Sequence, residues 1–343
     1  MSQSPESPPP NPGPAPAPAG PGAATSARPP ARNPGTALDL AGVQATRVNA
    51  AAVASRITAL AAARPVAAAV RPAWLMRAIA CTDLTTLAGD DTPGRVRRLC
   101  AKARLPLSPE AQTALGAHRP LTTAAVCVYH GLVETAVRAL DGTGIAVAAV
   151  STGFPAGLSP LPLRIEEIRA SVAAGAREID VVITRAHALT DNWSALYDEI
   201  AAFRDACGDA HMKVILATGE LGSPTRVARA ALVAMMAGAD FVKTSTGMEK
   251  VNATLPAALV MMRAIRDYHA RTGARVGFKP AGGIGSADEA LAYLVLLREE
   301  LGPEWMTPAR FRFGASRLLG DIERHLDLTL TGRHASPDHF ALG

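Results

Sequence analysis

Short apolar runs alternate with longer segments of helical periodicity along most of the chain. The apolar runs predict eight β-strands, at residues 81–87, 124–130, 145–151, 178–183, 212–218, 240–246, 274–282 and 311–316. Between them, apolar residues recur three or four positions apart, which is typical of helices that cover a sheet with one face. These helical segments include 163–176, 193–208, 226–238, 256–272 and 287–301. Near-continuous apolar strands predict a parallel sheet covered on both faces.

Eight strands, each followed by a helix over about 250 residues, predict an α/β fold of the (β/α)₈ barrel type. An open doubly wound sheet is the alternative. It usually has fewer strands, and no GxGxxG pattern follows the first strand here. Two Ala-rich helices, at 51–63 and 73–80, precede the barrel. The expected organisation is a disordered Pro/Ala-rich tail (1–36), a helical N-terminal extension (37–79), a (β/α)₈ barrel (80–332) and a C-terminal tail (333–343).

The first 36 residues differ from the rest of the chain. They hold 12 of its 27 prolines and no Leu, Ile, Val or aromatic residue. Such a segment buries too little apolar surface to offset the entropy of ordering it, so disorder is predicted. It has no apolar stretch of the kind found in secretory signals. Few acids and the presence of Arg28 and Arg32 leave an organellar transit peptide as an alternative, although no amphipathic pattern supports it.

Composition narrows the class of partner. The 343 residues are 48% hydrophobic but only 4% aromatic, so Ala, Val, Leu and Ile must build the core. No apolar run approaches the roughly 18 residues of a membrane helix, and no membrane association is expected. The net charge of +5 comes mostly from scattered Arg, without the clustering that nucleic-acid binding requires. Four cysteines without metal-like spacing predict reduced thiols in a cytoplasmic protein, and neither a metal nor a cofactor is expected.

Charged residues interrupt four consecutive predicted strands. Asp180, Lys213, Lys243 and Lys279 stand in strands four, five, six and seven. A charge in a strand covered on both faces is costly unless it is paired. Together the four predict one polar cluster near the C-terminal end of the barrel, where active sites of this fold lie. The alternative is a structural ion-pair cluster, but three lysines for one aspartate leave a positive surplus that is hard to explain as stabilisation.

That surplus has a chemical explanation if one lysine is meant to lose its proton. A free lysine has a pKa near ~10.4. Desolvation and a neighbouring cation lower that pKa. The neutral amine then attacks a carbonyl and forms a Schiff base, which withdraws electrons from an adjacent C–C bond without a metal or cofactor. Asp180 is placed to relay protons through a water molecule.

Glycine-rich loops follow the last three predicted strands. Their backbone N–H groups approach an anion closely because glycine has no side chain. In barrels, a phosphate site often forms from the loops after strands seven and eight. Gly282 and Gly283 in one loop, and Gly314, Ala315 and Ser316 in the other, suit that role. The alternative is that these are ordinary turns, in which glycine is common.

Several motifs, in this order, resemble those of deoxyribose-phosphate aldolases. They are CTDLTTL, TGFPAGL, EIDVVI, KVILATGEL, AMMAGAD, DFVKTSTG, VGFKPAGGI and FRFGAS, and the likeness runs from about Leu75 to Gly332. STGFPAGL and NATLPAALVMMRAIRD resemble most the animal-type branch. The resemblance implies a barrel-shaped class I aldolase that reversibly cleaves 2-deoxy-D-ribose 5-phosphate, a phosphosugar, to acetaldehyde and D-glyceraldehyde 3-phosphate in deoxyribose catabolism. It also implies a possible homodimer.

The resemblance assigns roles to individual residues. It makes Lys243 the Schiff-base nucleophile, Lys279 the neighbour that perturbs its pKa and transfers protons, and Asp180 the proton donor and acceptor. Cys127 lies in an apolar run, where packing is the simpler interpretation, but it also falls among the implied pocket residues. The expected substrate-binding set is Asp83, Thr85, Cys127, Lys213, Thr244, Gly247, Gly282, Gly283, Gly314, Ser316 and Arg317.

Three positions depart from the family pattern. Met248 and Gly285 stand where the family commonly has cations, and Arg317 stands where it commonly has Ser or Thr. One hypothesis is that Arg317 compensates for the lost charge by binding phosphate through its forked donors. The other is that phosphate recognition is relaxed and non-phosphorylated sugars or aldehydes are accepted. A non-catalytic phosphosugar-binding barrel is a third possibility, although binding alone does not require a lysine pair.

Overall fold

The computed structural model of the protein describes residues 32–62, 66–336 and 340. Eight parallel strands form one sheet in the order β7-β6-β5-β4-β3-β2-β1-β8. Two isolated parallel bridges, Phe278 with Phe311 and Ala281 with Gly314, join the β7 segment to the β8 segment. The sheet therefore closes on itself, which confirms the (β/α)₈ barrel and excludes the open doubly wound sheet.

All eight predicted strands are present, each within one residue of the predicted start or inside the predicted run. They are β1 (Thr82–Thr85), β2 (Ala125–Tyr129), β3 (Ala146–Ser151), β4 (Glu178–Val182), β5 (His211–Ile215), β6 (Phe241–Lys243), β7 (Gly277–Lys279) and β8 (Phe313–Ala315). The helices are α1 (Leu40–Ala45), α2 (Ala50–Ala62), α3 (Arg71–Ala80), α4 (Pro93–Arg104), α5 (Pro109–Ala114), α6 (Val133–Ala139), α7 (Leu161–Ala173), α8 (Arg185–Leu189), α9 (Trp193–Cys207), α10 (Pro224–Met236), α11 (Leu255–Thr272), α12 (Ala287–Leu301) and α13 (Leu318–Thr331).

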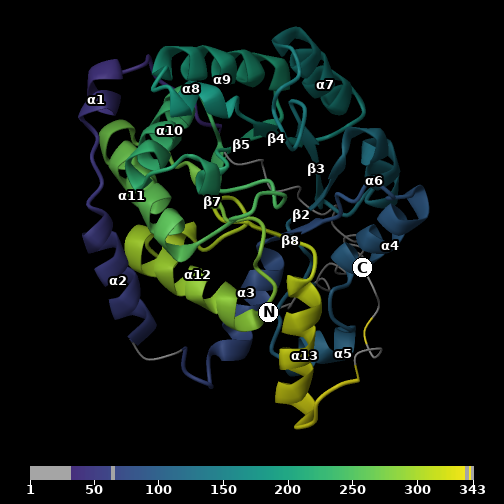
Figure 1. Cartoon of the computed structure of the whole chain (residues 1–343). Helices are drawn as coiled ribbons and strands as arrows, with labels where there is room; N and C mark the ends of the chain where they lie inside the picture. The colour runs from purple at the N-terminus through teal and green to yellow at the C-terminus, as the bar shows by residue number, and fades with distance from the viewer. Residues whose placement is uncertain (1–31, 63–65, 337–339, 341–343) are drawn as a thin grey trace, which may run out of the picture. The chain divides into compact units, whose positions relative to one another are not determined.

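The strands lie at the centre and the helices surround them (Figure 1). Successive side chains of a strand point to opposite faces of the sheet. On β4, Ile179 and Val181 belong to the large apolar core between sheet and helices. Their neighbour Val182 belongs to a separate small apolar cluster inside the barrel, together with Cys127 and Val150. The interior thus offers one apolar wall on β2 to β5, and charged groups occupy the rest.

Local signals set the lengths of the long helices. The hydroxyl of Thr254 accepts a hydrogen bond from the first turn of α11, which ends at Gly273 with φ +74°. At α12, Ser286 and Glu289 form a reciprocal capping box. Thr254 and Ser286 mark where these helices begin, and Gly273 marks where α11 ends. Because all eight strands are parallel, the loops that follow them gather at one end of the barrel.

The N-terminal extension packs on the outside of the barrel. Helix α1 contacts α9 and α10, α2 contacts α11, and α3 contacts α12 and α13. The predicted helix at 51–63 is present as α2, and the one at 73–80 begins two residues earlier, as α3.

Residues 33–36 are ordered against the barrel, so the prediction that disorder extends to residue 36 is wrong. Asn33 is 8% exposed, and its side-chain amide donates to the carbonyls of Met235 and Ala239. Its backbone N–H donates to Asp240, and Thr36 donates to the carbonyl of Met236. This segment is therefore held against the barrel by hydrogen bonds and not by the burial of large apolar side chains. The rest of the predicted tail, 1–31, lies outside the described residues, as do parts of 333–343.

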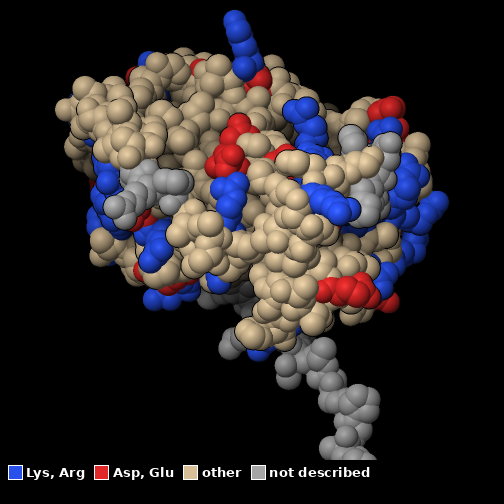
Figure 2. Space-filling view, turned by 90° about the horizontal axis from the view of Figure 1, so that it is seen from below, with Lys and Arg blue, Asp and Glu red and all other residues tan. Residues whose placement is uncertain are grey.

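No helix in the described ranges combines the length and apolarity needed to span a bilayer. Cys81, Cys100, Cys127 and Cys207 are all buried and unpaired. On the face seen in Figure 2, Lys and Arg side chains lie in separate groups with acidic and uncharged surface between them. That face presents no continuous basic patch of the kind that nucleic-acid backbones require.

Candidate active site

Strand pairing brings the four predicted charged residues together inside the barrel. Lys243 on β6 pairs with Lys279 on β7, and Asp180 on β4 pairs with Lys213 on β5. None of the four residues is more than 3% exposed. Because neighbours in a parallel pair project to the same face, the register alone predicts that each pair shares the interior.

Asp180 is the centre of the cluster. Its Oδ2 accepts hydrogen bonds from Nζ of Lys243 and from Nζ of Lys279, both at 2.7 Å. Its Oδ1 accepts from Nζ of Lys213 at 2.9 Å. One carboxylate oxygen therefore bridges the two lysines that the sequence assigns to catalysis, which is the arrangement required for moving a proton between them.

Three further charged residues, Asp83, Glu178 and Arg312, complete the cluster. Of these, only Asp83 was among the predicted site residues. Asp83 on β1 accepts from Lys279 at 2.5 Å and from Arg312 at 2.5 Å. Glu178 on β4 contacts Lys213 at 2.6 Å and Arg312 at 2.7 Å. A signal was available for both missed residues. Glu178 stands two positions before Asp180 and Arg312 two positions before Gly314, so each shares the inward face of its strand.

The complete cluster has four cations and three carboxylates. The cations are Lys213, Lys243, Lys279 and Arg312, and the carboxylates are Asp83, Glu178 and Asp180. The positive surplus is one charge, smaller than the two inferred from the strands alone. A surplus of one cation in a buried interior matches the loss of one proton from one lysine.

The environments of the two catalytic lysines shift their pKa values in opposite directions. Burial, together with the positive charge of Lys279, lowers the pKa of Lys243 despite the carboxylate of Asp180. Burial also disfavours the ammonium form of Lys279, but the carboxylates of Asp180 and Asp83 outweigh it and raise its pKa. Lys243 is therefore the residue that gives up its proton, and Lys279 the one that keeps it.

The carboxylates of the cluster stay ionised. Burial opposes ionisation, but the surrounding cations hold the pKa of Asp180 well below its usual range. Arg312 and the lysines lower the pKa values of Asp83 and Glu178 in the same way. Over residues 32–62, 66–336 and 340, no group of three or more His, Cys, Asp or Glu side chains is arranged to hold a metal ion.

Lys213 lies within the charged cluster, where its contacts are with carboxylates. It is fully buried, and Nζ has a carboxylate oxygen of Glu178 at 2.6 Å, Asp180 at 2.9 Å and Asp83 at 3.5 Å. An ammonium group has three donors. With a carboxylate for each, Lys213 keeps no donor for substrate and acts as an internal counter-ion.

Three other predicted site residues differ in the surfaces they present. Cys127 belongs to the apolar cluster inside the barrel, and burial raises the pKa of its thiol, so it offers an uncharged wall. Thr85 is half-buried at the end of β1. The hydroxyl of Thr244 is engaged with the backbone of Ala281, so it links two loops. Ser245 was not among the predicted site residues, although its buried hydroxyl has no partner among the described residues.

The loops after β6, β7 and β8 adjoin one another. A side chain added at Gly247, φ +94°, would come within 3.8 Å of Gly282, and the N–H of Gly282 donates to Gly314. Gly282 and Gly283 have φ values of +79° and +82°, which glycine adopts readily. At Gly314 the lack of a side chain has a packing reason, since a Cβ would lie 2.8 Å from Cβ of Ala281. A Cβ there would lie 3.1 Å from Cε of Lys279, so this glycine makes room for the catalytic lysine.

Of the two helices that begin near these loops, only α13 has an open N-terminus. At α12, the backbone N–H groups of Gly285 and Ser286 donate to Glu289, and that of Ala287 donates to Asp321. At α13, no side chain caps the first turn. Ser316 and Arg317 are exposed immediately before it, and Arg317 has no hydrogen bond or ion pair with the part of the chain that the structure describes.

Met248 lines a cavity whose other lining residues lie outside the Gly282–Gly283 loop. Its side chain is 55% exposed and lines a cavity of about 370 Å³ with Arg185, Glu220 and Glu249, among others. Arg185 is paired with both glutamates. The position that the family commonly fills with a cation therefore faces an existing ion-pair group in this chain.

Comparisons with known proteins agree with this site. The sequence model of the DeoC/LacD family aldolase matches residues 77–296. The chain belongs to this family. It is 56% identical to deoxyribose-phosphate aldolase from Bos taurus over 309 residues, covering 89% of this chain and 97% of the relative. Identity to the Homo sapiens deoxyribose-phosphate aldolase is 54% over 309 residues, with the same coverage.

Solved structures show the same fold. A protein from Toxoplasma gondii superposes with a TM-score of 0.65 at 23% identity, covering 76% of this chain and 97% of that one. A protein from Coccidioides immitis gives a TM-score of 0.58 at 24% identity, covering 79% and 97%. The sequence match to the family model ends before β8, whereas the structural superpositions cover nearly all of the solved barrels.

Proposed function

We propose that the chain is a Schiff-base aldolase that reversibly cleaves 2-deoxy-D-ribose 5-phosphate to acetaldehyde and D-glyceraldehyde 3-phosphate. The observation that carries this proposal is the bridge between Lys243, Asp180 and Lys279, in which burial lowers the pKa of Lys243 from its ordinary value. The mammalian relatives, more than half identical in sequence, carry the name of this activity.

The cleavage follows from the geometry. The neutral amine of Lys243 adds to the substrate aldehyde, and loss of water gives a protonated imine. A base removes the proton of the C3 hydroxyl, the C2–C3 bond breaks, and its electron pair moves into the imine to give an enamine. Glyceraldehyde 3-phosphate leaves. A proton then adds to the enamine carbon, and water releases acetaldehyde. Asp180 and Lys279, 2.7 Å apart, supply and accept these protons.

The phosphate group is assigned to the adjoining loops beyond the lysines. Gly283 would present its backbone N–H group, whereas that of Gly282 donates to Gly314, and Ser316 and Arg317 stand at the open N-terminus of α13. Anions bind at such helix ends because unpaired N–H groups and the helix dipole face them. Arg317 adds a full positive charge. This arrangement supports the compensation hypothesis over relaxed substrate preference.

Trapping of the covalent intermediate tests the proposal. Incubation with acetaldehyde and borohydride should add a reduced two-carbon group to Lys243, located by peptide mass mapping. Lys243→Ala should lose both the adduct and the cleavage of deoxyribose 5-phosphate, while the matched variant Lys250→Ala, an exposed lysine seven residues on, should keep both. An unmodified Lys243 in the active protein would refute the Schiff-base mechanism, and a folded protein without cleavage would support the non-catalytic alternative.

Assembly and location follow the same resemblance. A homodimer is the expected assembly and the cytoplasm the expected compartment. Light scattering coupled to size-exclusion chromatography measures the mass directly, and a monomer or tetramer would contradict the dimer.

A further inference from the structure

Arg312 is held rigidly beneath the catalytic residues. Its Nη2 donates to Glu178 at 2.7 Å, and Nη1 donates to Asp83 at 2.5 Å and to Glu178 at 3.1 Å. Its Nε donates to the carbonyl of Pro308, and the guanidinium lies 5.6 Å from the ring centre of Phe241. A guanidinium group that is hydrogen-bonded on both sides has little freedom to rotate, so it fixes the orientation of the carboxylates that it binds.

Asp83 divides its two oxygens between different partners. Oδ1 accepts from Arg312, whereas Oδ2 accepts from Lys279 at 2.5 Å and lies 3.5 Å from Lys213. Because Arg312 fixes Oδ1, the carboxylate cannot rotate away from Lys279. Glu178 in turn fixes Arg312, so a chain of contacts runs from the base of the interior to the proton-transferring lysine.

We propose that Arg312 and Glu178 are positioning residues of the aldolase that hold the carboxylate of Asp83 against the ammonium group of Lys279. Neither residue is assigned a place against the substrate. Both act through Asp83, which pairs with the residue that exchanges protons during turnover. The proposal rests on the proposed function, since it concerns the rate and pH dependence of that reaction.

The two residues have opposite charges, so their removal should move the pH profile in opposite directions. Without the cation of Arg312, Asp83 attracts the proton of Lys279 more strongly. The limb of the kcat profile that reports Lys279 then moves to higher pH. Without the anion of Glu178, the positive charges of Arg312 and Lys213 are less neutralised. They disfavour the ammonium form of Lys279, so its pKa falls and the limb moves to lower pH. The charged and titratable groups that face this pair are Arg312, Glu178, Asp180, Lys213, Lys243 and Cys127.

The experiment compares Arg312→Gln and Glu178→Gln with the wild-type chain, measuring kcat and KM for deoxyribose 5-phosphate across pH. We expect kcat to fall about 10- to 100-fold in each variant, as small displacements of a catalytic group do, with KM nearly unchanged. The limb should move by about one pH unit, upward for Arg312→Gln and downward for Glu178→Gln. Arg312→Lys, which keeps the charge, should restore much of the wild-type profile even if Arg312→Gln folds poorly.

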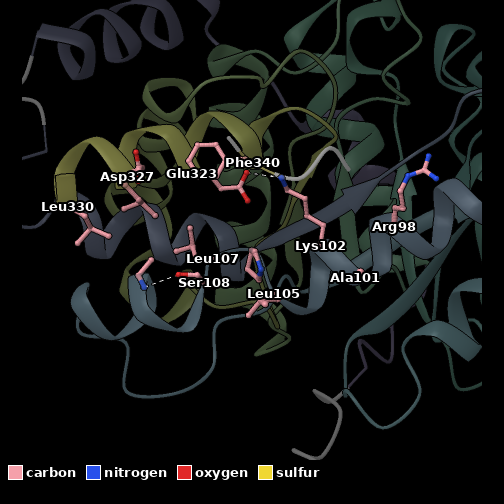
Figure 3. A pocket seen from close by; sticks show the side chains of 13 residues that line it. Arg98, Ala101, Lys102, Leu105, Leu107, Ser108, Glu323, Asp327, Leu330 and Phe340 are labelled. Atoms are coloured by element: carbon pink, nitrogen blue, oxygen red, sulfur yellow. Dashed lines mark hydrogen bonds and ion pairs between the residues drawn. The ribbon is translucent and has the colours of Figure 1, made fainter. Parts of the chain in front are cut away.

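A buried ion pair outside the barrel provides the matched control. Lys102 on α4 and Glu323 on α13 lie 2.8 Å apart, at 9% and 4% side-chain exposure, beside a cavity of about 550 Å³ (Figure 3). Glu323→Gln removes an equally buried glutamate charge without touching the cluster. It should lower the melting temperature and leave the pH profile of kcat in place.

Trapping with acetaldehyde and borohydride separates the two proposals. If the wild-type chain gives no adduct on Lys243, the proposed function fails. If the adduct forms in every variant but the profiles of Arg312→Gln and Glu178→Gln stay in place, or move in the same direction, the positioning role is overturned. Shifts of the two pH profiles in opposite directions support the positioning role, because a merely structural role predicts no shift of either profile.

Discussion

The proposed preference for phosphorylated over free sugars depends on two positions, Arg317 and Met248. Arg317 is exposed at the open end of α13 and has no internal partner in the described part of the chain, whereas Met248 faces the ion pairs of Arg185. Arg317→Ala should therefore lower kcat/KM for deoxyribose 5-phosphate relative to deoxyribose. A lost charge-assisted contact of about 1.5–3 kcal/mol corresponds to a loss of about 10- to 150-fold.

The control for that prediction is Arg324→Ala, which removes an exposed arginine two turns further along α13. It should leave the ratio of the two kcat/KM values unchanged. Met248→Lys tests the same question from the other side, since a cation restored there should raise the ratio if that position reaches the phosphate. An unchanged ratio in Arg317→Ala would favour relaxed recognition over compensation.

At the scale of the elements, composition and periodicity predicted all eight strands, because parallel strands buried on both faces must be apolar throughout. The charged exceptions then marked Asp180, Lys243 and Lys279 as a site. The sequence did not reveal how deeply two further charged residues, Glu178 and Arg312, are buried. Glu178 opens its strand and Arg312 precedes its own, positions where charges are usually solvated, so only closure of the barrel shows that both are buried. Closure of the barrel also brings Gly314 next to Lys279, where a Cβ would lie 3.1 Å from Cε of the lysine.

The pairing of β6 with β7 depends on a glycine. A Cβ at Gly277 would approach the ring of Phe241 to 2.3 Å, and Phe241 lies two residues before Lys243 on β6. Gly277→Ala should therefore lower the free energy of unfolding by about 1–3 kcal/mol through overpacking, as measured by urea denaturation. Phe241→Leu in the same chain should recover part of that loss, because it removes the clashing ring atoms.

Gly320→Ala is the control for the pairing prediction. Gly320 is in helix α13, and a Cβ there would meet no atom closer than 4.0 Å. Alanine in a helix should stabilise the protein by about 0.4–1 kcal/mol. If Gly277→Ala were equally stabilising, the contact with Phe241 would not constrain the strand pair.

At the scale of the whole molecule, the segment around Asn33 makes its contacts at the start of β6. Asp240, directly before that strand, accepts from Asn33, from Arg204 and from the backbone of Met212. The N-terminal segment therefore braces the end of the barrel opposite the lysine loops. Composition predicted disorder up to residue 36 because it weighs apolar content, whereas polar anchoring by a single asparagine leaves no trace in composition.

Two truncations test where the folded molecule begins. Removal of residues 1–31 should leave the melting temperature and kcat unchanged, because the contacts of Asn33 remain. Removal of residues 1–36 also deletes these buried hydrogen bonds and should cost about 1–3 kcal/mol. For a barrel of this size, that corresponds to a melting temperature lower by several degrees. Asn33→Ala in the full chain should reproduce most of the loss, with kcat at 25 °C unaffected because the site is at the other end of the barrel. Equal melting temperatures for the two truncations would show that the folded molecule begins after residue 36.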